Sequence, residues 1–225
     1  MNNKIKRQKV NNKLQIFWTN NKLIFLFVSL LLVFRSAVAD WNTVPTGSMK
    51  PTIVEGDRIF VNKMAYDLRL PFTHISLVTI ADPEPGDIII FDSVAADKKL
   101  VKRVIGIPGD AISMIGNVLS INGQALSYQP LKSNSDISSH KEILFGKTHS
   151  ITIKREGSSL SSFSEVTVPE NQFLVLGDNR DNSADSRVIG FVPRAEIVGQ
   201  ANKVIMSLDY DNYYLPRFER FFKSL

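Results

Sequence analysis

One serine stands in a stretch whose composition suits a nucleophile. Ser48 lies within residues 45–52, a turn of small residues bounded by Pro45 and Pro51. Gly47 allows a substrate backbone to approach closely, and the prolines restrict the chain, so the Ser48 hydroxyl has less freedom to lose on reaction. Taken alone, the stretch is equally compatible with a proline-bounded loop.

The base that such a serine requires is best supplied by Lys102. Its neighbours in residues 100–106 are mostly apolar, and strand alternation would point its side chain away from those of Val101 and Arg103. Desolvation can lower the usual lysine pKa of about 10.4 by several units, which provides a neutral amine near pH 8. A lone lysine is more often a solvated surface residue, so this assignment depends on partner motifs.

Histidine and cysteine offer no alternative chemistry. His74, His140 and His149 stand apart in the sequence and form no metal-binding spacing, so we expect lone polar surface histidines and no metal. The chain has no cysteine, which excludes thiol nucleophiles, cysteine-ligated zinc and disulfides. No residue pattern calls for a cofactor.

A third polar stretch, residues 177–187, follows an apolar strand that ends at Leu176. It is dense in Asp and Asn, which favour turns through side-chain-to-backbone hydrogen bonds. A bare turn-rich loop and a calcium loop are alternatives, although the spacing of an EF-hand is missing.

The elements that must position these residues are mostly short strands. Downstream of Asp40, β-rich runs alternate with Gly, Pro and Asn turns, which predicts an all-β fold. The predicted strands cover residues 58–63, 87–91, 101–106, 111–114, 118–122, 172–176 and 198–206. We predict a β catalytic core from residues 40–126 and 166–210, with an inserted loop or small β lobe at 127–165. Residues 211–225 carry Phe and Leu at helical spacing, which predicts a short C-terminal amphipathic helix that docks on the core or lies on lipid.

The positive charge is confined to the N-terminus. The net charge of +5 arises from seven basic residues and no acid within residues 1–35, whereas the rest holds 20 basic and 22 acidic side chains. A nucleic-acid-binding body would carry a basic surface, so nucleic acid is not expected as a partner.

An apolar run follows this basic segment. Residues 23–34 are apolar except Ser29. This run of twelve residues is shorter than the roughly 20 residues of a spanning helix unless it starts near residue 16. We therefore predict a cytoplasmic basic segment at 1–22 and a membrane anchor at 23–39. A cleavable secretory leader ending at Ala39 fits equally well, and either way the basic cluster keeps the N-terminus in the cytoplasm.

Four stretches, in this order, resemble the conserved boxes of bacterial type I signal peptidases, the Ser–Lys membrane proteases. They are residues 45–52, 56–63, 102–110 and 177–187, with 34–36 and 190–193 extending the similarity. The resemblance covers most of the chain outside residues 1–20 and 127–165. It implies a mainly antiparallel β core behind one N-terminal transmembrane helix, and endoproteolytic removal of signal peptides from exported preproteins.

The resemblance also assigns roles to individual residues. Ser48 would attack the scissile carbonyl and Lys102 would accept its proton, while the Ser48 N–H and the Thr46 hydroxyl would form the oxyanion hole. Supporting roles would fall to Ser183, which orients the Lys102 amine, and to Asp185 and Arg187, which pair and hold their loop. Shallow apolar pockets for small side chains would be lined by Val44, Pro45, Met49 and Val101.

Partners and location follow from the same resemblance. The substrates would be preproteins with Ala-x-Ala signal peptides, processed downstream of a secretion translocase. The N-terminal helix would be a retained single-pass anchor in the phospholipid of the cytoplasmic (inner) membrane, with the catalytic domain outside, in the periplasm. Self-cleavage after Ala39 stays a hypothesis, because residues 37–39 match the substrate pattern.

Other functions compete with this interpretation. Some family members have two N-terminal helices and this chain has room for one, so a specialised maturation peptidase of a conjugation or pilus system is an alternative. A self-cleaving repressor shares Ser–Lys chemistry but needs a DNA-binding module. A non-enzymatic envelope protein would not depend on Ser48 or Lys102.

Overall fold

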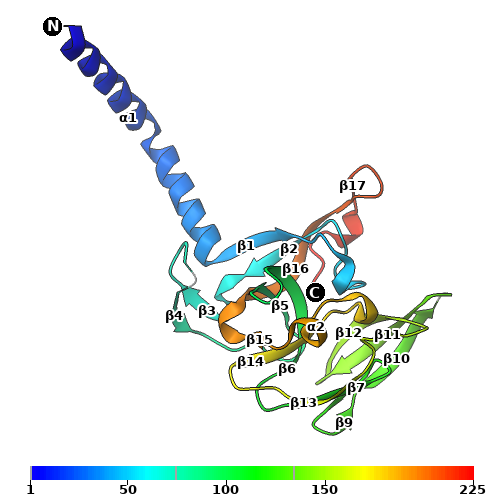
Figure 1. The fold of residues 1–225 in the computed structure, drawn as a ribbon. Helices are drawn as coiled ribbons and strands as arrows, with labels where there is room; N and C mark the ends of the chain where they lie inside the picture. Colours follow the sequence, from blue (N-terminus) through cyan, green and yellow to red (C-terminus); the bar gives the residue numbers. More distant parts are fainter. Residues whose placement is uncertain (1, 74, 134) are drawn as a thin grey trace.

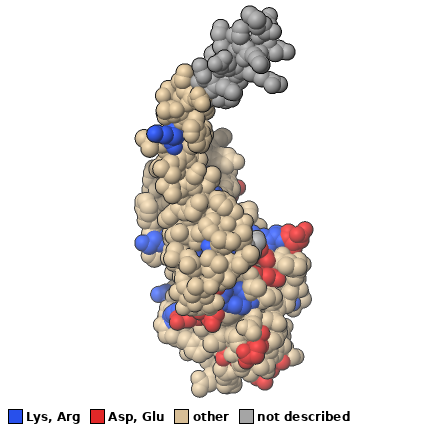
Figure 2. All heavy atoms as spheres, turned by 90° about the vertical axis from the view of Figure 1, so that its left-hand side faces the viewer, with Lys and Arg blue, Asp and Glu red and all other residues tan. Residues whose placement is uncertain are grey.

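A long helix and a β-rich body make up the computed structural model, which describes residues 2–73, 75–133 and 135–225 (Figure 1). Helix α1 (Asn2–Ala37) projects away from the body, and its segment Gln15–Ala37 is long and apolar enough to cross a membrane. In Figure 2 the described part of this helix is almost free of charged atoms below one basic patch near its upper end. The large apolar side chains from Ile16 to Phe34 are exposed, as expected of a surface that faces lipid.

The end of the helix is joined tightly to the body. Strand β1 (Ala39–Thr43) begins two residues after α1 ends, and Ala39 pairs with Asn62 of β2 (Asp57–Asn62). Ala37 and Ala39 are both buried. Cleavage after Ala39 would therefore require β1 to leave its sheet.

An eight-stranded antiparallel sheet forms the centre of the body. Its order is β1, β2, β16 (Ile197–Asp209), β5 (Ile88–Ser93), β6 (Lys98–Gly106), β14 (Gln172–Leu176) and β15 (Val192–Pro193), with β17 (Leu215–Pro216) paired to the end of β16. Alternate residues of β5 enter two core clusters: Ile88 and Ile90 join one, and Ile89 and Phe91 join the other. Both faces of the sheet are therefore covered.

Two smaller sheets extend the body. One has the order β13 (Phe163–Thr167), β7 (Ala111–Ile115), β8 (Val118–Ile121) and β9 (Gln124–Ala125). Gly116 and Asn117 both have positive φ in the tight β7–β8 hairpin, a conformation that these residue types tolerate best. The other sheet is β10 (Ser127–Ser133), β11 (Ile137–Leu144) and β12 (Lys147–Lys154), so the 127–165 segment contains a β lobe. A separate hairpin joins β3 (Asp67–Arg69) and β4 (Ser76–Thr79).

The predicted C-terminal helix was wrong. Residues 211–225 contain β17 and only one 3₁₀ turn, η5 (Phe218–Arg220). Tertiary contacts override the helical spacing, because Arg217 pairs with Asp209 at 2.9 Å and Arg220 pairs with Asp57 at 2.6 Å. Phe222 has a φ of 56°, which interrupts any right-handed helix.

Candidate active site

The predicted nucleophile and base lie in direct contact. Lys102 Nζ donates a hydrogen bond of 2.8 Å to Ser48 Oγ. Ser48 belongs to the 3₁₀ turn η1 (Gly47–Met49) and Lys102 to strand β6, so two separate elements bring them together. A second bond of 3.1 Å, from Lys102 Nζ to the Val101 carbonyl, fixes the direction of the amine.

Burial adjusts the amine for proton transfer. Lys102 is only 2% exposed. Desolvation lowers the pKa of Lys102 to about 8; the charge of Asp185 opposes this shift and that of Lys98 adds to it. A neutral amine is therefore accessible near neutral pH, as a general base requires.

The turn that carries Ser48 is held by a residue that sequence patterns did not single out. The backbone N–H of Asn179 donates to the Ser48 carbonyl at 3.0 Å, and its side-chain amide donates to the Gly47 carbonyl at 3.0 Å. Thr152 of β12 donates to the Lys50 carbonyl and to Asn179 Oδ1, both at 3.2 Å. The small lobe thus supports the nucleophile turn through Asn179.

Ser183 lies close to the site without the contact predicted for it. It is buried, and its hydroxyl has no hydrogen-bond partner among the described residues. The Lys102 amine instead donates to Ser48 Oγ and to the Val101 carbonyl. A Cβ at Gly177 would lie 2.5 Å from the Ser48 carbonyl oxygen and would also meet the Ser183 hydroxyl, so glycine is required there.

Asp185 and Arg187 form the ion pair predicted for them. Their side chains are 2.7 Å apart, and Asp185 is fully buried. Asp185 also accepts a hydrogen bond from the Gly177 N–H at 2.9 Å, while Arg187 donates to the Arg180 carbonyl at 2.6 Å. The pair therefore ties the start of the loop to its end.

A further buried ion pair was not anticipated. Arg103 donates to both carboxylate oxygens of Asp178, at 2.8 and 2.7 Å, next to the base Lys102. Burial alone would raise the pKa of Asp178, but the Arg103 guanidinium holds that pKa below its usual value. The sequence carried one signal for this ion pair. Lys102 and Arg103 are adjacent in a strand, so alternation places their side chains on opposite faces of β6.

A hollow of about 310 Å³, which we call the Ser48 groove, opens in front of the two catalytic candidates. It contains all four predicted pocket residues, together with Thr46 and two residues of the polar loop. Thr46 is exposed, and its hydroxyl does not cap η1. The lining residues are Val44, Pro45, Thr46, Gly47, Ser48, Met49, Lys98, Lys99, Leu100, Val101, Lys102, Asn182 and Ala184.

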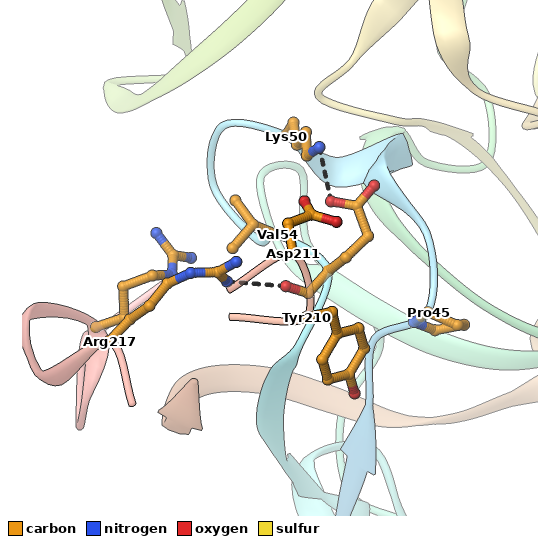
Figure 3. Close-up of a pocket in the computed structure, with 8 residues that line it drawn as sticks. Pro45, Lys50, Val54, Tyr210, Asp211 and Arg217 are labelled. Carbon is orange, nitrogen blue, oxygen red and sulfur yellow. Dashed lines mark hydrogen bonds and ion pairs between the residues drawn. The ribbon is translucent and has the colours of Figure 1, made fainter. Parts of the chain in front are cut away.

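A second hollow, of about 490 Å³, lies on the other side of Pro45 (Figure 3). One dashed line there marks the 2.7 Å ion pair between Lys50 and Glu55. This pair covers the nucleophile turn, because a Cβ at Gly47 would lie 2.6 Å from a Glu55 carboxylate oxygen. The mixed charges of this hollow contrast with the more apolar Ser48 groove.

The two described histidines, His140 and His149, are not part of the Ser48 groove lining. His74 is outside the described residues. His140 bonds to Ser138 at 2.8 Å. The prediction of a surface position was wrong for His149, whose side chain is 7% exposed and lies 3.1 Å from Glu142, a carboxylate also paired with buried Arg180. The described residues contain no group of three metal-ligating side chains.

Comparison with known proteins adds independent information. The profile of the family described as signal peptidase, peptidase S26, matches residues 17–206. Signal peptidase I of Pseudomonas aeruginosa is 32% identical, over 93% of this chain and 80% of that protein. Signal peptidase I of Bacillus amyloliquefaciens is 33% identical, over 88% and 89%. A signal peptidase I crystal structure from Enterococcus faecalis is 31% identical, with a TM-score of 0.36, over 54% of this chain and 98% of that chain.

Proposed function

Because the chain belongs to the signal peptidase family, peptidase S26, we propose that it is a serine endopeptidase in which Ser48 and Lys102 remove N-terminal signal peptides from exported preproteins. The observation that carries the residue assignment is the 2.8 Å contact between a desolvated amine and a hydroxyl. A serine becomes an effective nucleophile only when a base accepts its proton, and Lys102 is the base within reach.

In the proposed mechanism Lys102 acts twice. The neutral amine takes the Ser48 proton as Oγ attacks the scissile carbonyl carbon, and the resulting ammonium then protonates the leaving amine. The neutral amine then deprotonates a water molecule that attacks the acyl-enzyme carbonyl carbon, and the resulting ammonium returns the proton to Ser48 Oγ as the acyl C–Oγ bond breaks. The proton balance of the cycle thus needs no group beyond Lys102.

Two donors suit the developing oxyanion. Ser48 lies within the single turn η1, and the first N–H groups of a helical turn have no acceptor inside it. The exposed Thr46 hydroxyl stands two residues before Ser48 and is not consumed as a cap. We assign both donors to the oxyanion, with Ser183, Asp185 and Arg187 in supporting positions.

The edge of β6 supports binding of an extended peptide. Strand β6 pairs with β5 from Lys98 to Arg103, but with β14 only from Arg103 onward. Within the described chain, residues 98–102 therefore have a partner strand on one side, and a substrate segment can add as a strand on the other. The apolar residues Val44, Pro45, Met49 and Val101 then face its small side chains, which fits an Ala-x-Ala sequence.

The helix places this chemistry at a membrane. The span Gln15–Ala37 is long and apolar enough to cross a membrane, and it leads directly into β1 of the body. We propose a single-pass anchor in the cytoplasmic membrane, with the basic N-terminus inside and the body on the outer, periplasmic face. There it would receive preproteins from a secretion translocase.

Cleavage of a precursor tests the proposed function. The detergent-solubilised full chain is incubated with a precursor that bears an Ala-x-Ala leader, and product is identified by N-terminal sequencing. Ser48→Ala and Lys102→Ala are expected to lower the cleavage rate by at least about 10³-fold. The control Lys141→Ala alters an exposed strand residue of β11 and should retain full activity. Unaltered cleavage by either catalytic variant would refute the assignment.

The rival functions predict different results. A repressor-type protease would bind DNA in a salt-dependent manner. Such a protease needs a DNA-binding module, whereas the described N-terminal element is a helix with an apolar span. A peptidase dedicated to one conjugation or pilus system would cleave that precursor and spare general secretory precursors. A panel of precursors under the same conditions separates a dedicated peptidase from a general one.

A further inference from the structure

Two lysines stand where strand β6 enters the Ser48 groove. Lys98 and Lys99 are the first residues of β6, both are exposed, and both line the groove. Lys99 is neutralised by Asp92 at 3.1 Å. No acidic partner is found for Lys98 among the described residues, so its charge is available to a ligand.

The register of β6 places Lys98 at a defined distance from the chemistry. Lys98 and Lys102 are four residues apart and therefore share one face of the strand, about 13 Å apart at about 3.3 Å per residue. Their charges also interact, since Lys98 contributes to the lowered pKa of Lys102. The two amino groups are therefore close enough to interact electrostatically across the Ser48 groove.

The direction of a bound substrate follows from the two walls of the groove. Residues 44–45 run toward Ser48, and residues 98–101 run toward Lys102, so both walls lead to the site of reaction. The part of a substrate before its scissile bond ends at Ser48 and would run parallel to both. Counting back along an extended chain, its fourth or fifth residue before the cut lies beside Lys98.

We propose that Lys98 selects substrates by charge, favouring an acidic side chain four or five residues before the scissile bond and disfavouring a basic one. This inference rests on the proposed function and adds a charge preference to it. Because Lys98 is exposed, the effect is that of a solvated ion pair: about a threefold to tenfold preference for Glu over Lys, weakened by salt.

Competing substrates test the proposal. Three precursors with one Ala-x-Ala site carry Glu, Gln or Lys at the fourth and fifth positions before the cut, and kcat/KM is measured for each. The wild type should rank them Glu, Gln, Lys. Lys98→Glu should reverse this order, and Lys98→Gln should abolish it. Ratios between substrates cancel any change that the variants cause in Lys102 protonation.

A charge-matched control isolates the position. Lys141→Glu makes the same charge change on the exposed face of β11 and should keep the wild-type ranking. Equal cleavage of the three precursors by the wild type, or an order that Lys98→Glu leaves unchanged, would overturn the proposal. If cleavage is Ser48-dependent but blind to charge, only this inference fails; if no precursor is cut in a Ser48-dependent manner, the proposed function itself fails.

Discussion

Lys102 Nζ lies 2.8 Å from Ser48 Oγ, across 54 residues of sequence, and this contact joins the buried part of β6 to a partly buried turn. The strand removes water from the amine, while the turn keeps the hydroxyl open to the Ser48 groove. A flexible surface lysine would reach the serine but would stay charged at neutral pH. The distance and the burial are therefore both required for the proposed chemistry.

The buried amine is expected to reduce stability. Because folding lowers the pKa of Lys102 to about 8, the penalty on its charged form is complete below pH 8 and disappears above the unfolded-state value of 10.5. Lys102→Met, which removes the charge and keeps the length, should raise the free energy of unfolding by about 3 kcal/mol at pH 7. At pH 10 the gain should shrink to about 1 kcal/mol. Urea unfolding in detergent measures both values, and a gain that does not depend on pH would contradict this cause.

The hydroxyl of Thr46 is expected to act on the transition state. Thr46→Val preserves shape and removes the donor, so kcat should fall by about 10²–10³-fold with little change in KM. Thr46→Ser keeps a donor and should restore most of the rate. Steady-state kinetics on one precursor provides this comparison. A full rate in the valine variant would remove Thr46 from the oxyanion hole.

Asn179 is expected to position the nucleophile turn. Asn179→Asp preserves the acceptor for Thr152 but loses the donor to the Gly47 carbonyl and places a carboxylate there. We expect kcat to fall by about tenfold or more, because one misplaced ångström at a nucleophile costs up to about 10²-fold. Circular dichroism should show an intact fold. Loss of binding with unchanged kcat would instead indicate a direct substrate contact.

Much of the fold was predictable because its strands follow simple local rules. The seven predicted strands match β2, β5, β6, β7, β8, β14 and β16 to within a few residues. Alternation and turn residues mark these strands, as at Asn122 and Gly123, which both have positive φ. The predicted C-terminal helix was wrong because its spacing is local information, whereas the ion pairs of Arg217 with Asp209 of β16 and of Arg220 with Asp57 of β2 hold the segment against the sheet.

The site was predictable to the extent that its chemistry lies in short motifs. Ser48, Lys102 and the 185–187 pair each belong to a recognisable stretch of sequence. Asn179 and Thr152 were missed because their roles depend on β12 lying beside the polar loop, a contact between segments far apart in the chain. His149 was misplaced because its burial depends on the β11–β12 pairing, in which its partner Glu142 faces it.

The pH dependence of kcat/KM for cleavage of one precursor tests the central claim most directly. A base with a pKa of about 8 must lose its proton before it acts, so log kcat/KM should rise with a slope of one below pH 8 and level off above it. Activity at pH 6 should be about 1% of the plateau. A profile flat between pH 6 and 8, or one still rising with unit slope toward pH 10, would contradict the claim that a desolvated Lys102 activates Ser48.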